Sequence, residues 1–154
     1  MATTTVHVPG PAHTDVTYHG AVVAVPGYGQ PMLEPQVAMV TRGGDYFGLM
    51  PHVPLHSPAG FAWGYAGSGP TDLARSLLIH ALGRAARCRH CHGVGTGRCR
   101  PGRCCRDGYR TDLPVAAFKD EYVTGWAWHE EWTVTRSEVL AWLATHGLYT
   151  DDPQ

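Results

Sequence analysis

The chain has 154 residues and is 44% hydrophobic, which suits one domain of ordinary size with a core of its own. No apolar run approaches the ~18 residues of a membrane-spanning helix, and the N-terminus lacks the basic start and apolar stretch of a secretory signal. We therefore expect a cytoplasmic protein without a membrane partner. The formal net charge is only -1, but residues 84–110 carry eight arginines and one acid, a net +7. That asymmetry indicates an anionic partner, or a basic segment docked on the protein's own acidic body.

The N-terminal part of the domain reads as a sheet. Residues 1–14, rich in Thr, Pro and His, are expected to form a flexible arm. Short runs of β-branched and aromatic residues follow at 16–25, 36–40 and 45–50, separated by turns rich in Gly and Pro. This pattern predicts a small antiparallel sheet whose last strand is an edge or ends at the prolines that follow it.

Three helices are predicted after the sheet. Apolar residues at helical spacing predict a helix that starts near Pro70 and runs to about Arg87. A second helix is predicted over 113–128, and a third begins at a capping box formed by Thr135 and Glu138 and stops at Gly147. The expected fold class is α+β, with one domain over 15–147 and a short tail at 148–154.

All five cysteines lie in a single stretch between the first and second predicted helices, with the spacing C-x2-C-x7-C-x4-C-C. These candidate metal ligands are Cys88, Cys91, Cys99, Cys104 and Cys105. Thiolates at this spacing favour a closed, structural zinc site that stabilises an inserted loop over 88–110. We expect Cys88, Cys91, Cys99 and Cys104 to be the ligands, with Cys105 as substitute. His90 or His92 could replace a cysteine, and a redox pair or ordinary thiols remain alternatives.

Arginines alternate with these cysteines, and a metal-held loop would project them together. The candidate nucleic-acid contacts are Arg89, Arg98, Arg100, Arg103 and Arg106. Guanidinium groups on such a loop favour contact with backbone phosphates rather than sequence-specific contact with bases. The alternatives are a solvated face or counter-charge to the acidic remainder of the chain.

A glycine-rich corner precedes the first helix. Gly67, Ser68 and Gly69 stand where amides at a helix start could bind an anion or a partner, although no P-loop pattern follows. The corner can equally be a tight turn in which Trp63 and Tyr65 pack into the core. Asp72 and Arg75, three residues apart, read as a pair on the helix surface. A small hydrolase that uses His56, Asp72 or Ser68 is a further alternative.

Residues 61–74 spell F-x-W-G-Y-x-G-S-G-P-x-D-L-A, residues 118–121 spell FKDE, and residues 132–143 end in a W-L pair. Over roughly residues 16–146 this pattern resembles an uncharacterised family of small bacterial, archaeal and phage proteins, a domain of unknown function. The resemblance implies a compact α+β domain in a phage or mobile-element setting, and it implies no reaction. Against that pattern the cysteine cluster looks like an insertion. Its first ten residues, CRHCHGVGTG, also resemble one unit of the zinc domain of DnaJ-type chaperones.

These features predict a non-enzymatic zinc-binding accessory protein that contacts nucleic acid or a nucleoprotein partner through its arginine-rich loop. The first alternative is a protein-interaction module of a phage or mobile element, such as a host-takeover or defence-evasion factor. The sequence leaves the oligomeric state and the identity of the partner open.

Overall fold

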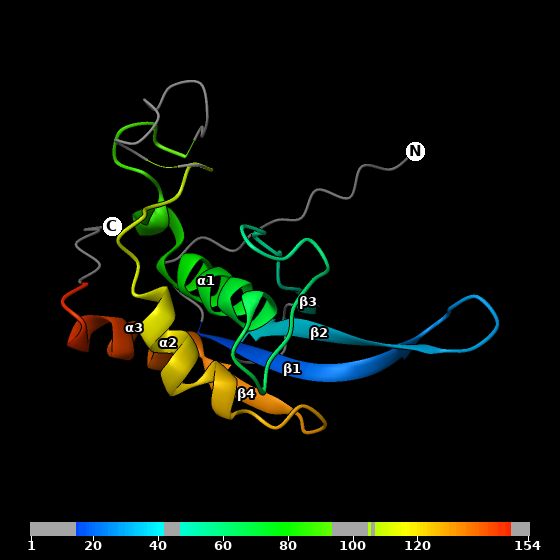
Figure 1. The fold of residues 1–154 in the computed structure, drawn as a ribbon. Helices are drawn as coiled ribbons and strands as arrows, with labels where there is room; N and C mark the ends of the chain where they lie inside the picture. The colour runs from blue at the N-terminus through cyan, green and yellow to red at the C-terminus, as the bar shows by residue number, and fades with distance from the viewer. Residues whose placement is uncertain (1–14, 42–46, 94–104, 106, 149–154) are drawn as a thin grey trace.

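The computed structural model describes residues 15–41, 47–93, 105 and 107–148 of the chain (Figure 1). The elements, in chain order, are β1 (Val16–Val25), β2 (Met32–Thr41), β3 (Phe47–Leu49), α1 (Ser68–Leu82), the 3-10 helix η1 (Gly83–Ala86), α2 (Val115–Glu121), the 3-10 helix η2 (Val123–Gly125), β4 (Trp132–Thr135) and α3 (Arg136–Thr145). The four strands form one antiparallel sheet in the order β3-β2-β1-β4. The predicted α+β class, with an N-terminal antiparallel sheet and three helices, is confirmed.

Near α1, β1 and β2 each bury every second residue, as expected of strands with one face on the core. Val16 and Tyr18 in β1 and Met39 in β2 are buried, and Tyr18 lies opposite Met39 in the register. The predicted start of β2 at residue 36 is four residues late, because Pro35 reads as a strand break. Pro35 is tolerated because β3 pairs only with residues 38–40, so that part of β2 has a free edge and needs no donor there.

The far half of this hairpin projects beyond the helices in Figure 1. Its exposed apolar side chains are Val23, Tyr28, Met32 and Leu33. The buried ends of the strands, by contrast, meet α1, where the Tyr18 hydroxyl and Nδ1 of His80 form a hydrogen bond of 2.7 Å. Burial raises the pKa of Tyr18 well above its usual range, so the phenol stays protonated.

The fourth strand, β4, was not predicted. Residues 132–135 pair antiparallel with Thr17–Gly20 of β1, so the C-terminal part of the chain completes the sheet. The segment is only four residues long and runs directly into the capping box of α3, which made it read as the approach to a helix. Its alternation of buried Trp132 and Val134 with the more exposed threonines is the signal that marks a strand.

The helices differ from prediction mainly at their ends. α1 stops at Gly83, which has a φ of 59°, and the chain continues as η1 rather than as α-helix to Arg87. α2 covers only the first part of the predicted span 113–128. The capping box of α3 is confirmed, since the Thr135 side chain accepts from the Glu138 N–H and the Glu138 carboxylate accepts from the Thr135 N–H. Within the described ranges no helix is both long and apolar enough to cross a membrane.

Three tryptophans pack together beside β4. Trp63 is fully buried and meets Trp132 edge-on, with ring centroids 5.6 Å apart, and Trp132 stacks on Trp126 at 4.0 Å. Trp63 thus packs in the core as one reading of the corner predicts, whereas Tyr65 does not, because it is 51% exposed. Trp132 in turn lies over Gly20 of β1, where an added Cβ would fall 2.0 Å from the indole ring.

Replacement of Gly20 by Ala should therefore destabilise the protein, because the methyl group cannot coexist with the Trp132 ring. We expect the free energy of unfolding to fall by about 1–3 kcal/mol, the usual cost of overpacking, as measured by urea denaturation. Gly125→Ala is the matched control, since its Cβ would enter open space. Equal stability of the Gly20→Ala variant and the wild type would show that the Trp132 packing is wrong.

Candidate metal centre and the adjoining basic surface

The first two cysteines sit on a tight turn that follows η1. The N–H of His92 donates to the carbonyl of Cys88 at 2.8 Å, which closes the turn around Cys91. His92 and Gly93 both adopt positive φ, 52° and 91°, and so reverse the chain immediately after the second cysteine. Glycine meets this requirement without strain, whereas His92 adopts a conformation uncommon for a residue with a side chain. The turn brings the Cys88 and Cys91 thiols to the same side.

The returning chain is tied to this turn by backbone pairing. The N–H of Cys88 donates to the carbonyl of Gly108 at 2.7 Å, and the N–H of Arg110 donates to the carbonyl of Ala86 at 2.9 Å. An isolated antiparallel bridge joins Arg87 to Tyr109 between them. Gly108, with φ 95°, lies so close to the turn that a Cβ would be 2.6 Å from the Gly93 carbonyl oxygen. We call residues 86–93 together with 105 and 107–110 the knuckle.

Three cysteine sulfurs meet inside the knuckle. The Sγ atoms of Cys88, Cys91 and Cys105 all lie within 4.8 Å of one another. The Cys91 and Cys105 sulfurs are 3.4 Å apart, too far for a disulfide bond and close to the ~3.8 Å edge of a tetrahedron with Zn–S bonds of about 2.3 Å. Cys88 and Cys91 are buried, at 5% and 2% exposure. The group could hold a metal ion.

Cys105, which was expected only as a substitute, is the third member of this group. Of the other predicted ligands, Cys99 and Cys104 lie outside the described residues, so their role stays a prediction. His90 and His92 are exposed, and the group of ligand atoms found within the described part of the chain contains neither.

An ion pair between the buried Arg75 and the partly exposed Asp107 anchors the knuckle to α1. Arg75, whose side chain is 6% exposed, places Nη2 2.7 Å from Oδ2 of Asp107, and its guanidinium lies 5.6 Å from the centroid of the Tyr109 ring. The predicted surface pair of Asp72 and Arg75 is therefore wrong, because both residues are buried and each serves a different partner. The prediction failed because spacing along a helix does not tell which face points inward.

Asp72 clamps the segment before the glycine-rich corner onto α1. Its carboxylate, fully buried, accepts backbone N–H groups of Leu55, His56 and Ser57 at 2.7–3.1 Å. Burial acts to raise the pKa of Asp72, but these donors, Ser57 first, and the His56 ring outweigh burial and hold the pKa below its usual value.

Of the residues of the predicted hydrolase alternative, His56 and Asp72 are in contact. His56 Nδ1 lies 3.1 Å from Asp72, and His52 Nε2 lies 3.7 Å from it, whereas Ser68 begins α1. The carboxylate is engaged by three backbone donors, which gives it a structural role. At the predicted anion corner, the carbonyl of Gly67 accepts from the Thr71 N–H and hydroxyl, and Gly69 is buried against Ala62. Binding at Gly67, Ser68 and Gly69 stays a prediction.

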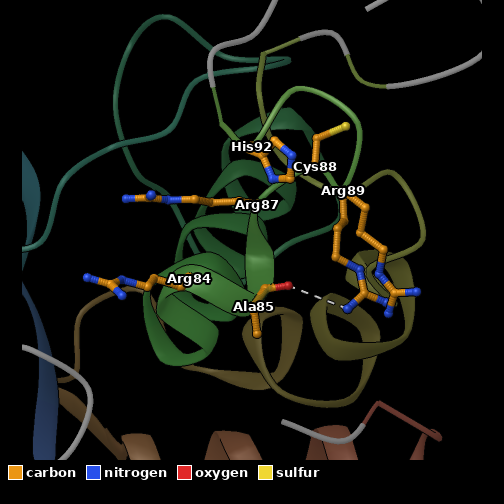
Figure 2. A pocket seen from close by; sticks show the side chains of 7 residues that line it. Arg84, Ala85, Arg87, Cys88, Arg89 and His92 are labelled. Atoms are coloured by element: carbon orange, nitrogen blue, oxygen red, sulfur yellow. Dashed lines mark hydrogen bonds between the residues drawn. The ribbon is translucent and has the colours of Figure 1, made fainter. Parts of the chain in front are cut away.

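A basic pocket opens beside the knuckle (Figure 2). It has a volume of about 450 Å³ and is lined by Arg84, Ala85, Arg87, Cys88, Arg89, His92 and Arg110. Of the arginines predicted to contact nucleic acid, only Arg89 belongs to the described residues; Arg98, Arg100, Arg103 and Arg106 lie outside them. Arg84, Arg87 and Arg110 were missed as a group, although they belong to the same charge-dense stretch of sequence.

Residues 18–93 match the sequence model of a family described as a family of unknown function (DUF6166). The match covers just under half of the chain, from β1 through Cys88 and Cys91, and so supports similarity to an uncharacterised domain family. No curated protein and no solved structure matched the chain. The predicted extension of the family pattern to residue 146, and the status of the cysteine cluster as an insertion, stay predictions.

The Asp72 clamp predicts an acid-dependent loss of stability. Because the folded-state pKa is lowered, the stabilisation is complete above the unfolded value of about 3.9 and is lost as pH falls through the folded value. Asp72→Asn should lower the free energy of unfolding at pH 7 by about 1.5–3 kcal/mol. The difference from the wild type should shrink between pH 5 and pH 2, measured by denaturant titration at each pH.

Asp120→Asn on the surface of α2 is the matched control, because it changes an exposed carboxylate beside Lys119. Its effect should stay below about 0.5 kcal/mol at pH 7. A deficit of Asp72→Asn that stays constant down to pH 2 would contradict the clamp.

Proposed function

We propose that this protein is a non-enzymatic zinc-binding accessory protein that contacts nucleic acid, or a nucleoprotein partner, through the arginine-rich segment around its metal centre. The observation that carries the proposal is the convergence of the Cys88, Cys91 and Cys105 sulfurs within 4.8 Å in the segment that holds eight of the chain's arginines. A fourth thiolate from Cys99 or Cys104 completes a tetrahedral site. Thiolate ligands favour zinc over the harder divalent ions.

The metal has a structural role in this proposal. Four thiolates leave no open coordination position for a substrate or an activated water. The knuckle contributes few apolar side chains to the core, so metal coordination supplies stability that burial does not. A cytoplasmic location, where thiols stay reduced, belongs to the same proposal.

A second candidate function is a protein-interaction module of a phage or mobile element. The exposed apolar side chains of Tyr28, Met32 and Leu33 on the projecting hairpin favour it, since such residues suit a protein contact better than a phosphate contact. In this candidate the basic segment meets an acidic protein surface.

The metal centre is tested by elemental analysis of protein purified without added metal. We expect about one zinc ion per chain, because one tetrahedral site uses four thiolates. Cys88→Ser, Cys91→Ser and Cys105→Ser should each abolish retention of the metal, and only one of Cys99→Ser and Cys104→Ser should do so. The spared cysteine is the matched control. Retention of zinc by all three variants of the first group would rule out the site.

Nucleic-acid contact is tested by the salt dependence of binding. The affinity for a labelled DNA duplex of about 20 base pairs should fall linearly in log–log form as salt rises, because phosphate contacts release counterions. Arg98, Arg100 and Arg103 replaced together by Ala should flatten that slope. A partner from cell extract that survives nuclease treatment, together with no binding to the duplex, would instead favour the protein-interaction module.

A further inference from the structure

We infer that Arg84, Arg87 and Arg89 form a binding site for the phosphates of a polynucleotide backbone, and that metal in the knuckle controls its affinity. The inference rests on the proposed function and deepens it, because it adds a contact at Arg84, Arg87 and Arg89 to the contact proposed for the loop arginines. It also connects metal binding with nucleic-acid binding, because both involve the same pocket.

The charge of the pocket is the first argument. Four arginines and one histidine line it, and no acidic side chain is among its lining residues in the described part of the chain. Arg110 is already engaged, since its Nε and Nη2 donate to the Asp112 carboxylate at 2.8 and 2.7 Å. Its Nη1 also donates to the Ala85 carbonyl at 3.4 Å, the bond drawn in Figure 2. Arg110 therefore shapes the pocket, and the other three arginines give it a net positive charge, with Arg89 also lining a neighbouring hollow that contains Asp112.

The placement of those three arginines favours an extended polyanion. Arg84 comes from η1, Arg87 from the bridge to Tyr109, and Arg89 from the turn between the two cysteines. In Figure 2 the Arg84 and Arg87 side chains extend in one direction and the Arg89 side chain in another. All three residues are exposed. Guanidinium groups so divided can each bind a different phosphate of one chain, whereas they do not converge on a single phosphate ion.

Cys88 connects the candidate metal site to the pocket. It lines the pocket, and its sulfur is one of the three in the candidate metal site. It stands between Arg87 and Arg89 in the chain, so coordination of its sulfur fixes the backbone that carries both arginines. His92, on the same turn, also lines the pocket. A site held in its binding geometry loses less entropy on association, so metal should strengthen phosphate binding.

This coupling is reciprocal by thermodynamic necessity. If zinc raises the affinity for a polynucleotide by a given factor, then the polynucleotide raises the affinity for zinc by the same factor. A metal whose binding left the pocket unchanged would produce neither effect.

The experiment measures fluorescence anisotropy of a labelled duplex of about 20 base pairs against zinc-loaded full-length protein at several salt concentrations. Arg84→Ala, Arg87→Ala and Arg89→Ala should each weaken binding about three- to tenfold at low salt and lower the salt slope by about 1, as loss of one phosphate contact does. Lys119→Ala is the charge-matched control on α2, and it should leave the slope unchanged. Circular dichroism and zinc content verify that each variant stays folded and loaded.

The second arm removes the metal. Chelation should weaken binding of the wild type by about tenfold or more, the ordinary scale of such coupling, and added zinc should restore it. Titration with a competing chelator should then show tighter zinc binding in the presence of the duplex, by the same factor. Equal duplex affinity with and without zinc would overturn the coupling.

The outcomes separate this inference from the function on which it rests. If the duplex binds with a steep salt slope but the three arginine variants behave like Lys119→Ala, the pocket assignment is wrong and the proposed function stands. If zinc-loaded protein does not bind the duplex at all, the proposed function fails with it. Pyrophosphate that competes as well as unlabelled duplex at equal phosphate concentration would contradict the extended backbone and indicate a site for small phosphates.

Discussion

The arrangement of the candidate site depends on one short stretch of backbone pairing, between residues 86–88 and 108–110. That pairing carries Cys105 back to Cys88 and Cys91, although the chain between them is long and rich in glycine. The ion pair of the buried Arg75 with the partly exposed Asp107 fixes the returning segment to α1, a helix that itself lies in the core. Because Arg75 is buried, loss of Asp107 would leave its charge without this partner.

The charged residues in and near the basic segment differ in their surroundings. Asp107 of the segment forms an ion pair with Arg75 of α1, and Arg110 of the segment forms one with Asp112. These pairs are not those of a basic segment docked on an acidic body, because Asp107 is the acid of the segment and Arg75 belongs to α1; that reading of the charge asymmetry stays a prediction. Arg84, Arg87 and Arg89 remain around the pocket.

The sequence predicts an element well where the residues of that element alone determine its structure. The bounds of β1 and the capping box of Thr135 and Glu138 follow from period and cap chemistry, and the structure confirms both. β4, the role of Cys105 and the burial of Asp72 and Arg75 depend on contacts between distant segments, which spacing along the chain does not encode. Asp72 in particular reads as a surface residue, because nothing local reveals that three backbone donors converge on it.

The pairing of Thr17 with Thr135 has a consequence for how this fold tolerates change. The pairing of β1 with β4 closes a large loop of the chain. The pairing of residues 86–88 with 108–110 closes a smaller ring within it. The entropy of closing a loop between fixed ends grows only with the logarithm of its length, about 0.6 kcal/mol for each doubling. Inserting a few residues between Cys91 and Cys105 would therefore add well under about 0.6 kcal/mol to the cost of closing the smaller ring, provided that the cysteines themselves are kept.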